Sequence, residues 1–290
     1  MNHVPPSRLT RLNDAPVRDD GRYVVYWMVA HRRLEWNFAL DQAVGRAREF
    51  DVPLVILEAL RIGYPWASPR HHRFVLDGMR EHRDRLAGGP VTYLPYVEPS
   101  EGAGKGLLSA LAAKACLVVT DDYPVFFLPR MQATAARRLD VRLERVDSNG
   151  LYPMRAAART FTMAVHFRRH LQKHLGTHLT EMPSPAPLDD IDLADLDTLP
   201  DGLLDRWPPA DDGLLDGDDA ALAAPPLAHD VPPVPISGGA SAARERLETF
   251  LARHLESYGE GRNDPDDDRS SRLSPWLHWG HLSTHEAFHR

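Results

Sequence analysis

The sequence predicts an α/β fold: a Rossmann-like, five-stranded parallel sheet with flanking helices, then a long linker and the beginning of an all-α domain. Three observations predict it. Short β-branched runs bounded by Gly, Pro or polar residues alternate with amphipathic stretches between residues 22 and 146. A segment rich in Pro and Asp follows, and helical periodicity resumes after residue 240. Such strand–helix alternation is typical of a parallel sheet covered on both faces.

The carboxyl ends of the predicted strands are the expected place for a ligand. In an open parallel sheet, ligands usually bind beyond these ends. We therefore expect a ligand near residues 29–33, 60–63 and 120–123. The predicted strands are 23–29, 52–60, 91–96, 116–120 and 141–146. The predicted helices between them are at about 36–49, 69–87, 103–114 and 127–139.

Composition divides the chain into four parts. Residues 183–235 hold 11 of the 25 prolines, and such a polar, proline-interrupted segment is expected to run over the surface without building a core. The stretch before it, 155–174, is basic and has apolar residues at helical spacing. The expected parts are an N-terminal tail (1–21), an α/β domain (22–150), a basic helix with a linker (151–237) and the start of a helical domain (238–290).

The negative charge of the chain is concentrated in one segment. The formal net charge is −7 at pH 7, but residues 189–219 contain 12 Asp and one basic residue, Arg206. The rest of the chain therefore carries a formal +4. This balance permits an anionic partner such as nucleic acid, without requiring one.

Cysteine content and hydropathy indicate a cytoplasmic protein. Cys116 is the only cysteine among 290 residues, so no intrachain disulfide can form and a reducing compartment is expected. No run approaches the roughly 18 apolar residues of a membrane span. The first 20 residues show no apolar stretch of the signal-peptide kind, and we expect no membrane partner.

The stretch "HEAFH", residues 285–289, matches the HExxH pattern of zinc peptidases. Zinc chemistry there requires a third protein ligand and an open position for water. His281 continues the four-residue spacing, but at about 1.5 Å per residue it lies roughly 12 Å from His289, too far for one metal ion. A ligand from another part of the fold stays open as an alternative. The favoured interpretation is the start of a His-rich amphipathic helix, with no metal bound.

Three further stretches stand at predicted strand ends. "GAGKG", residues 102–106, lacks the spacing of a phosphate-binding loop and predicts a flexible connection. Asp121 and Asp122 follow a strand and suit helix capping, or else a metal ion or a sugar hydroxyl. The basic turn after the first strand, which contains Arg32, Arg33 and Asn37, is either part of a ligand edge or a solvated turn.

Three stretches together resemble the photolyase/cryptochrome family, most closely its class II cyclobutane pyrimidine dimer photolyases. "YWMVAHRRLEWNFAL" is similar to the first strand and helix of that family, and "VVTDDYP" to the end of its fourth strand. "GG" at 238–239, followed by "RERLETFLARHLESYGEGRNDPDDDRSSRLSPWLHWGHLS", resembles the start of its flavin-binding helical domain. In this resemblance "HEAFH" occupies the place of a flavin-domain helix.

The resemblance implies a light-driven DNA-repair lyase. Reduced FAD would pass an electron to a cyclobutane pyrimidine dimer flipped out of damaged DNA, and the α/β domain would hold a second, light-harvesting chromophore of folate or deazaflavin type. Arg262 matches a position near the DNA phosphates, although an ion pair to Asp264 or Asp268 is an equal alternative. Electron-transfer residues are not assigned. The positions that match FAD contacts are Tyr258, Ser270, Ser271, Arg272, Leu273 and Ser274.

The sequence also departs from the family. Trp279, Gly280 and His281 stand where Phe, Gly and Gln are usual, and the family's flavin domain continues for several times the length present here. Three explanations stay open: a fragment, an interrupted reading frame, or a second chain that completes the domain. The 290 residues alone are expected to be inactive in repair. The alternative function is a non-catalytic, cryptochrome-like light sensor or a chromophore-binding remnant.

Overall fold

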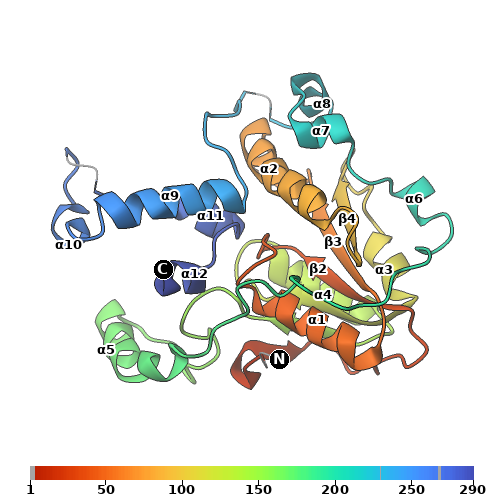
Figure 1. The fold of residues 1–290 in the computed structure, drawn as a ribbon, viewed down its shortest axis with the longest axis horizontal. Helices are drawn as coiled ribbons and strands as arrows, with labels where there is room; N and C mark the ends of the chain where they lie inside the picture. Colours follow the sequence, from red (N-terminus) through yellow and green to blue (C-terminus); the bar gives the residue numbers. More distant parts are fainter. Residues whose placement is uncertain (1–3, 229, 267–268) are drawn as a thin grey trace.

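A six-stranded, mostly parallel sheet forms the centre of the molecule (Figure 1). The computed structural model describes residues 4–228, 230–266 and 269–290. The strand order is β1-β6-β5-β2-β3-β4, and every neighbouring pair is parallel except β1 with β6. The strands are β1 (Leu9–Arg11), β2 (Tyr23–Met28), β3 (Leu54–Leu60), β4 (Val91–Val97), β5 (Ala115–Asp121) and β6 (Leu143–Val146).

The five predicted strands are confirmed, and the structure adds a sixth. β1 comes from the N-terminal tail and pairs antiparallel with β6, with Leu9 opposite Val146. The side chain of Arg8, just before β1, is fully buried, and it donates to the carbonyl oxygens of Gly150 and Leu151 at 3.0 and 2.8 Å. Burial in this position lowers the pKa of the Arg8 guanidinium. The tail therefore completes one edge of the sheet.

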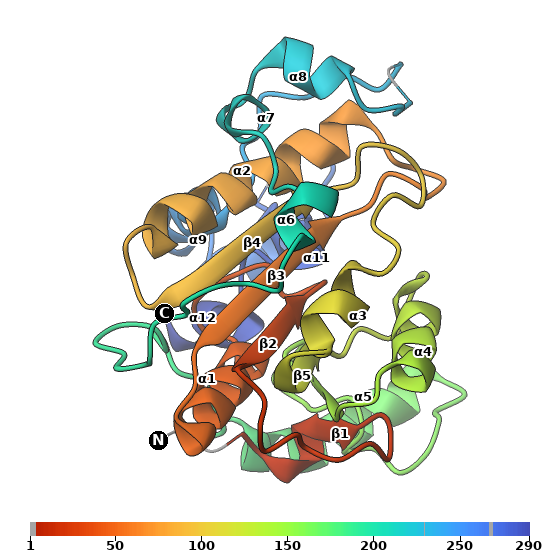
Figure 2. The same cartoon turned by 90° about the vertical axis from the view of Figure 1, so that its right-hand side faces the viewer.

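Four helices cover the two faces of the sheet. Figure 2 shows α1 (Phe38–Phe50) and α2 (Pro69–Leu86) on one face, and α3 (Leu107–Ala112) and α4 (Leu128–Arg138) on the other. This arrangement follows from right-handed crossovers, because the chain runs outward from β2 to β4 and then returns to β5 on the other side of β2. The strand order thus reverses between β2 and β5, the place where such sheets bind ligands.

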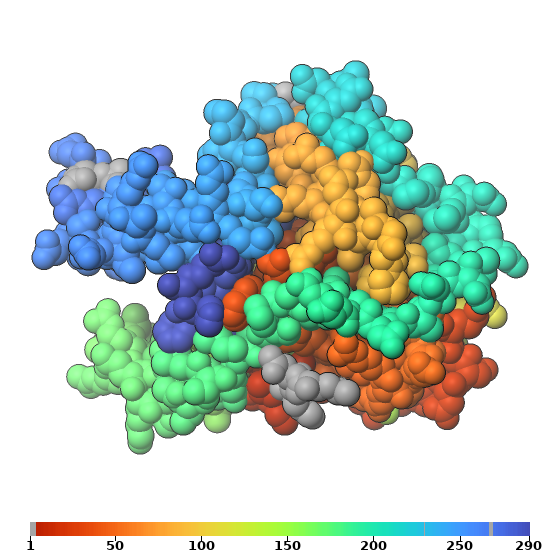
Figure 3. Space-filling model, viewed as in Figure 1, coloured from red at the N-terminus to blue at the C-terminus, as the bar shows by residue number. Residues whose placement is uncertain are grey.

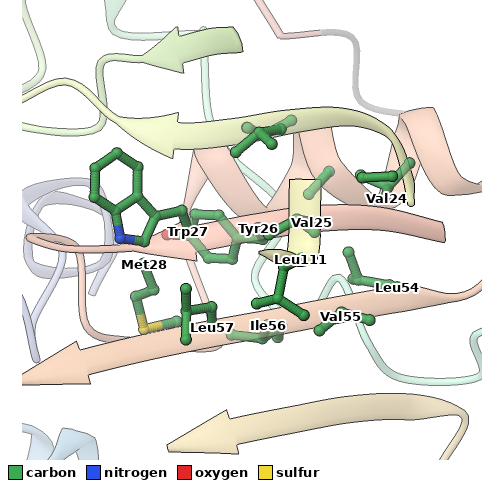
Figure 4. Packing of buried hydrophobic residues seen from close by; sticks show 14 of the residues in the cluster. Val24, Val25, Tyr26, Trp27, Met28, Leu54, Val55, Ile56, Leu57 and Leu111 are labelled. Atoms are coloured by element: carbon green, nitrogen blue, oxygen red, sulfur yellow. The ribbon is translucent and has the colours of Figure 1, made fainter. Parts of the chain in front are cut away.

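The central strands β2 and β5 are buried along their whole length, and β3 is buried except at Ala59. Both faces are covered, so the apolar runs of β2 and β3 do not alternate with polar residues. Figure 4 shows apolar side chains of β2, β3 and α3 in this core, among them Val25, Ile56 and Leu111. The hydroxyl of Tyr23 donates to the carbonyl oxygen of Leu111 at 2.9 Å, which satisfies a polar group inside this core.

The expectation of a linker without a core is wrong in part. Its prolines do keep its helices short, but buried apolar side chains fasten it to the α/β region. Trp207 packs in the main core and its indole nitrogen donates to the carbonyl oxygen of Ala103 at 3.0 Å. Leu215 packs with Val75 and Met79 of α2. The elements of this segment are α5 (Ala164–His174), η2 (Leu175–His178), α6 (Leu203–Arg206), α7 (Asp212–Asp216) and α8 (Asp219–Ala223).

One 14-residue helix and three short ones form the C-terminal segment, which packs on α2 and on the turn after β2. Their apolar cluster includes Leu247, Leu273 and Trp276, and it closes around Phe74 of α2. The helices are α9 (Ala240–Arg253), α10 (Tyr258–Gly261), α11 (Ser274–Trp279) and α12 (Thr284–His289). In the described part of the chain, we find no helix that combines the length and the apolar character needed to cross a bilayer.

Candidate functional site

A cavity of about 930 Å³ opens at the carboxyl ends of the strands. Its walls include residues from all three predicted ranges: Val29 and Arg32 after β2, Leu60 and Arg61 at the end of β3, and Tyr123 after β5. Parallel strands bring their carboxyl ends to one edge of the sheet, so short patterns in the sequence were enough to locate this edge. The cavity therefore lies where the strand pattern predicted a ligand.

The walls of the cavity are mainly apolar and rich in aromatic rings, and their charged side chains are mostly cationic. A site of this kind suits a flat, conjugated ligand that a small number of polar groups orient. Glu98 supplies negative charge, and the positive charge comes from Arg32, Arg61, Lys105, Arg130 and Arg138. Sequence reasoning missed most of the rings, although aromatic residues cluster after the second and fourth predicted strands. The aromatic wall residues are Trp27, Tyr64, Trp66, Tyr96, Tyr123, Phe126, Phe127 and Trp279.

The glycine-rich loop binds a carboxylate of the protein itself. Glu98 is almost fully buried, and its Oε1 accepts from the backbone amides of Gly102 and Gly104 at 2.9 and 3.2 Å. Its Oε2 accepts from the amide of Ile62 at 3.3 Å. The amides that a phosphate would need are thus directed at Glu98, in keeping with the prediction that "GAGKG" is a connection and no phosphate loop.

Asp121 holds the turn after β2, and the two interpretations of the Asp pair are both wrong. Its Oδ2 accepts from the amides of Val29 and Ala30, each at 2.8 Å, and from the amide of His31 at 2.9 Å. Its Oδ1 accepts from the hydroxyl of Tyr26 at 2.6 Å. Burial beside this carboxylate raises the pKa of Tyr26 well above its usual value. Asp121 therefore shapes the cavity wall, and it neither caps a helix nor faces a ligand.

The neighbouring Asp122 also forms ion pairs inside the protein. The carboxylate of Asp122 is almost fully buried and pairs with Arg155, and with Arg145 at 3.5 Å. The helix that follows, α4, starts after Phe127 without any side-chain cap. A capping role for the aspartates fails because six residues, 122–127, separate β5 from α4.

The basic turn is buried and paired, so the interpretation as a solvated turn is wrong. Arg32 reaches Glu58 at 2.8 Å, and Glu58 also contacts His82 at 2.8 Å and accepts from Tyr93 at 2.7 Å. Burial would raise the pKa of the Glu58 carboxyl, but His82, Arg32 and Tyr93 together lower it to about 2. Asn37 caps α1 by accepting from the amide of Ala39.

Arg33 connects the turn after β2 to the C-terminal helices. The guanidinium donates to the carbonyl oxygens of Trp36, Gly280 and Ser148 at 3.2, 2.9 and 3.1 Å. A β-carbon at Gly280 would lie 1.9 Å from the carbonyl oxygen of Ala30, and this glycine has a φ of +77°. The close approach brings the C-terminal segment to the mouth of the cavity, where Trp279 forms part of the wall.

Four of the six predicted FAD-binding positions, residues 270–273, form the loop before α11, and Ser274 is the first residue of that helix. Arg246 of α9 donates to the carbonyl oxygens of Ser270 and Ser271, at 3.2 and 2.8 Å, and so fixes the loop. The hydroxyl of Ser271 accepts from the amide of Leu273 at 3.4 Å. Leu273 is buried in the apolar cluster, which leaves its backbone as the part that can meet a ligand. Arg272 and Ser274 are exposed.

Tyr258 and Arg262 lie next to each other, one helical turn apart. The guanidinium of Arg262 lies 5.6 Å from the centre of the Tyr258 ring, which packs edge-on against Phe250. Arg262 is exposed, and Tyr258 is half-buried. Of the two acidic partners considered for Arg262, Asp268 lies outside the described residues. The cavity described above is lined by other residues, so the predicted FAD positions form a separate surface.

The residues of the HExxH pattern contact different parts of the protein and do not face one common site. His285 is buried against the ring of Phe38, and burial lowers its pKa to about 3. Glu286 pairs with Arg244 and Arg290 at 3.1 and 3.2 Å. Over residues 4–228, 230–266 and 269–290, no group of three potential ligands is placed to hold a metal ion.

A family model and several curated relatives match this chain. Residues 24–187 match the family model described as DNA photolyase. The deoxyribodipyrimidine photo-lyase of Methanothermobacter thermautotrophicus is 30% identical over 281 residues, which are 97% of this chain and 58% of that protein. The protein of the same name from Oryza sativa subsp. japonica is 30% identical over 283 residues, covering 91% of this chain and 51% of the relative. The chain thus spans about half the length of these relatives.

A solved structure has the same fold. The class III photolyase from Agrobacterium tumefaciens aligns with a TM-score of 0.63 at 19% identity, over 93% of this chain and 52% of that protein. At this level of identity the match shows the architecture alone. It covers both the sheet and most of the segments that follow it.

Proposed function

The chain belongs to the DNA photolyase family, and from this premise we propose that it acts in the light-driven repair of cyclobutane pyrimidine dimers, as part of a deoxyribodipyrimidine photo-lyase. The names of its relatives support the reaction class. The observation that carries the proposal is the aromatic cavity at the strand ends, walled jointly by the α/β region and the C-terminal helices. Assignment to class II rests on the sequence motifs.

We propose that this cavity holds the second, light-harvesting chromophore. A fused-ring dye of folate or deazaflavin type would stack between aromatic walls, where burial of its rings supplies most of the binding energy. Arg61 and Arg130 would attract an anionic part of the dye, and Glu98 would accept a hydrogen bond from it. The α/β domain at 22–150 and the linker at 151–237 would then position this site, and the segment from 238 on would form the flavin side.

The loop before α11 fits FAD by its donor chemistry. The hydroxyls of Ser270, Ser271 and Ser274 and the exposed guanidinium of Arg272 suit a diphosphate, and Arg246 fixes their backbone. Tyr258 would flank the same cofactor. When bound and reduced, FAD supplies the light-driven electron donor. The residues of this chain would bind and orient it, and Leu273 would contribute through its backbone.

The proposed substrate is DNA that contains pyrimidine dimers. Extrusion of a base costs a few kcal/mol and less at a poorly stacked, damaged site, which favours the lesion. The exposed Arg262 would attract a phosphate near it. The exposed apolar side chains of Leu255, Leu277 and Phe288 offer a surface on which a second chain could complete the flavin domain.

The test combines flavin binding with repair. Because the 290 residues alone are expected to be inactive, the chain is extended by the part of the Methanothermobacter thermautotrophicus relative that it does not span, supplied with FAD, reduced, and mixed with dimer-containing DNA under blue or near-UV light. Repair that depends on light and on reduced flavin supports the proposal, and Tyr258→Ala should weaken flavin retention more than the matched change Tyr152→Ala in the residues that follow β6. Bound, reduced flavin without any light-dependent loss of dimers would instead favour a non-catalytic light sensor.

A further inference from the structure

We propose that helix α5 is a second contact surface for DNA, one that binds the phosphate backbone of the duplex without reading the lesion. The inference rests on the proposed function, because it takes DNA as the partner. Between residues 155 and 174 there are five Arg or Lys residues and no Asp or Glu. This local charge contrasts with the strongly acidic segment 189–219 that follows.

The structure presents this charge on an exposed helix. None of the 11 residues of α5 is buried, and Arg168, Arg169 and Lys173 are all exposed. Within the described residues, no carboxylate lies at ion-pair distance from these three side chains. By contrast, Arg155, at the start of the stretch, pairs with Asp122 and is not available. Three cations of α5 therefore face solvent without a counter-charge.

The two sides of α5 differ in chemistry. On the inner side, the ring of His170 is hydrogen-bonded to the hydroxyl of Tyr152 at 2.7 Å. The same ring packs against Phe161. At 100° per residue, Arg168 and Arg169 point at least 100° away from His170, and Lys173 about 60° away. Arg169 and Lys173 are one turn apart, about 6 Å along the axis. The outer side is thus a basic strip.

This arrangement fits a duplex better than a membrane surface. A helix that lies in a bilayer interface needs a continuous apolar face opposite its charges. In α5 that face is interrupted by His170 and His174, its apolar members are Phe167 and the half-buried Leu171, and Phe167 packs on Phe161 with 5.3 Å between the ring centres. Duplex DNA carries one charge per about 1.7 Å of its length, so a short basic strip can neutralise several phosphates without apolar contact.

The position of α5 also suits a long, rod-shaped partner. In Figure 1, α5 lies on the same side of the molecule as α9, α10 and α12, and in Figure 3 both groups form the surface of that side. Arg262, the residue predicted to lie near DNA phosphates, follows α10. A duplex that reaches the flavin side could therefore extend toward α5, which would hold the flanking backbone.

The test measures the binding of undamaged duplex DNA to the 290-residue chain by fluorescence anisotropy over a range of salt concentrations. The triple change Arg168→Gln, Arg169→Gln and Lys173→Gln should make the slope of log K against log salt less negative by about 2 to 3, because each lost phosphate contact removes about 0.9. Affinity should fall roughly 100-fold at about 0.1 M salt. Glutamine keeps the helix propensity, so circular dichroism should be unchanged.

The matched control removes three exposed charges near the amino-terminal ends of the strands, by Arg48→Gln, Lys114→Gln and Arg137→Gln. Equal losses in the two triple variants would overturn the proposal, and so would an unchanged slope in the α5 variant. The proposal would also be overturned if the α5 variant lost binding only to anionic lipid vesicles, or only to dimer-containing DNA, and kept its binding to undamaged duplex DNA. Failure of photorepair would count against the proposed function alone, because this test uses undamaged DNA in the dark.

Discussion

The α/β region and the C-terminal helical segment are held together in different ways. In the α/β region, strands buried on both faces and a fully paired polar network at Asp121 create one continuous core. The C-terminal segment has a small apolar cluster that depends on Phe74 of α2, and it leaves Leu255, Leu277 and Phe288 exposed. The α/β region therefore has its own hydrophobic core, whereas the C-terminal segment is ordered by packing against α2.

The comparison shows how a cavity can be shared between unequal parts. Its floor comes from strand ends that the core fixes, and one side of its mouth comes from Trp279, which is in place only while the helices stay docked. Ligand binding at the cavity should therefore respond to changes in either region. Global stability should respond mainly to changes in the α/β region.

The largest effect is expected at Asp121. Asp121→Ala would leave three buried amides and the Tyr26 hydroxyl without an acceptor, and we expect a loss of about 3–5 kcal/mol in the free energy of unfolding. Urea denaturation followed by circular dichroism measures it. The control Asp140→Asn removes an exposed partner of Arg18 and should cost less than about 1 kcal/mol. Similar losses in both variants would contradict the role given to Asp121.

A smaller effect, confined to the docked segment, is expected at Gly280. Gly280→Ala would place a β-carbon against the carbonyl oxygen of Ala30 in a left-handed conformation, and should cost about 2–4 kcal/mol. Limited proteolysis should then cut within residues 238–290 and spare the sheet. Gly259→Ala, whose β-carbon would meet no atom within 4 Å, is the control. Cleavage of the sheet at the same rate would show that the two regions unfold as one.

Acid should weaken the docking through His281. Its Nδ1 accepts from the amide of Gly239, and burial lowers its pKa to about 3. The folded-state pKa lies below the unfolded value of about 6.5, so the stabilisation is complete above pH 6.5 and declines as the pH falls toward 3. At pH 5 this histidine alone should account for a loss of about 2 kcal/mol.

The measurement is the free energy of unfolding at pH 7 and pH 5. His281→Gln offers a neutral acceptor and should reduce the loss, while His166→Gln on exposed α5 should leave it unchanged. An identical pH dependence in all three proteins would show that His281 does not cause the loss of stability at pH 5. His285, with its pKa also lowered to about 3 by burial, should behave in the same direction.

The smallest effect on stability and the sharpest on ligand binding are expected inside the cavity. Ala59→Phe would fill part of the space next to β3, and should weaken chromophore binding about tenfold or more while the free energy of unfolding changes by less than about 1 kcal/mol. Absorption of the bound dye after reconstitution measures it. Ala133→Phe on the exposed surface of α4 is the control. Unchanged dye retention in Ala59→Phe would place the chromophore elsewhere.

The sequence by itself determined the five parallel strands of the sheet and the location of the cavity. β-Branched runs such as "YVVYWM" and "LVILEAL", and the helical patterns between them, are local signals that require no knowledge of distant residues. Once the strands are parallel, their carboxyl ends must share an edge. The motifs of the first and last thirds were also enough to suggest the family.

Only the tertiary structure decided what the polar residues at that edge do. Asp121 and Asp122 suggested capping or a ligand, but the amides that Asp121 binds follow another strand, more than 90 positions earlier in the sequence. The buried Arg8 and the anchoring Trp207 share this property. Local patterns encode local structure, whereas the partner of a buried polar group is set by which distant segments the fold brings into contact.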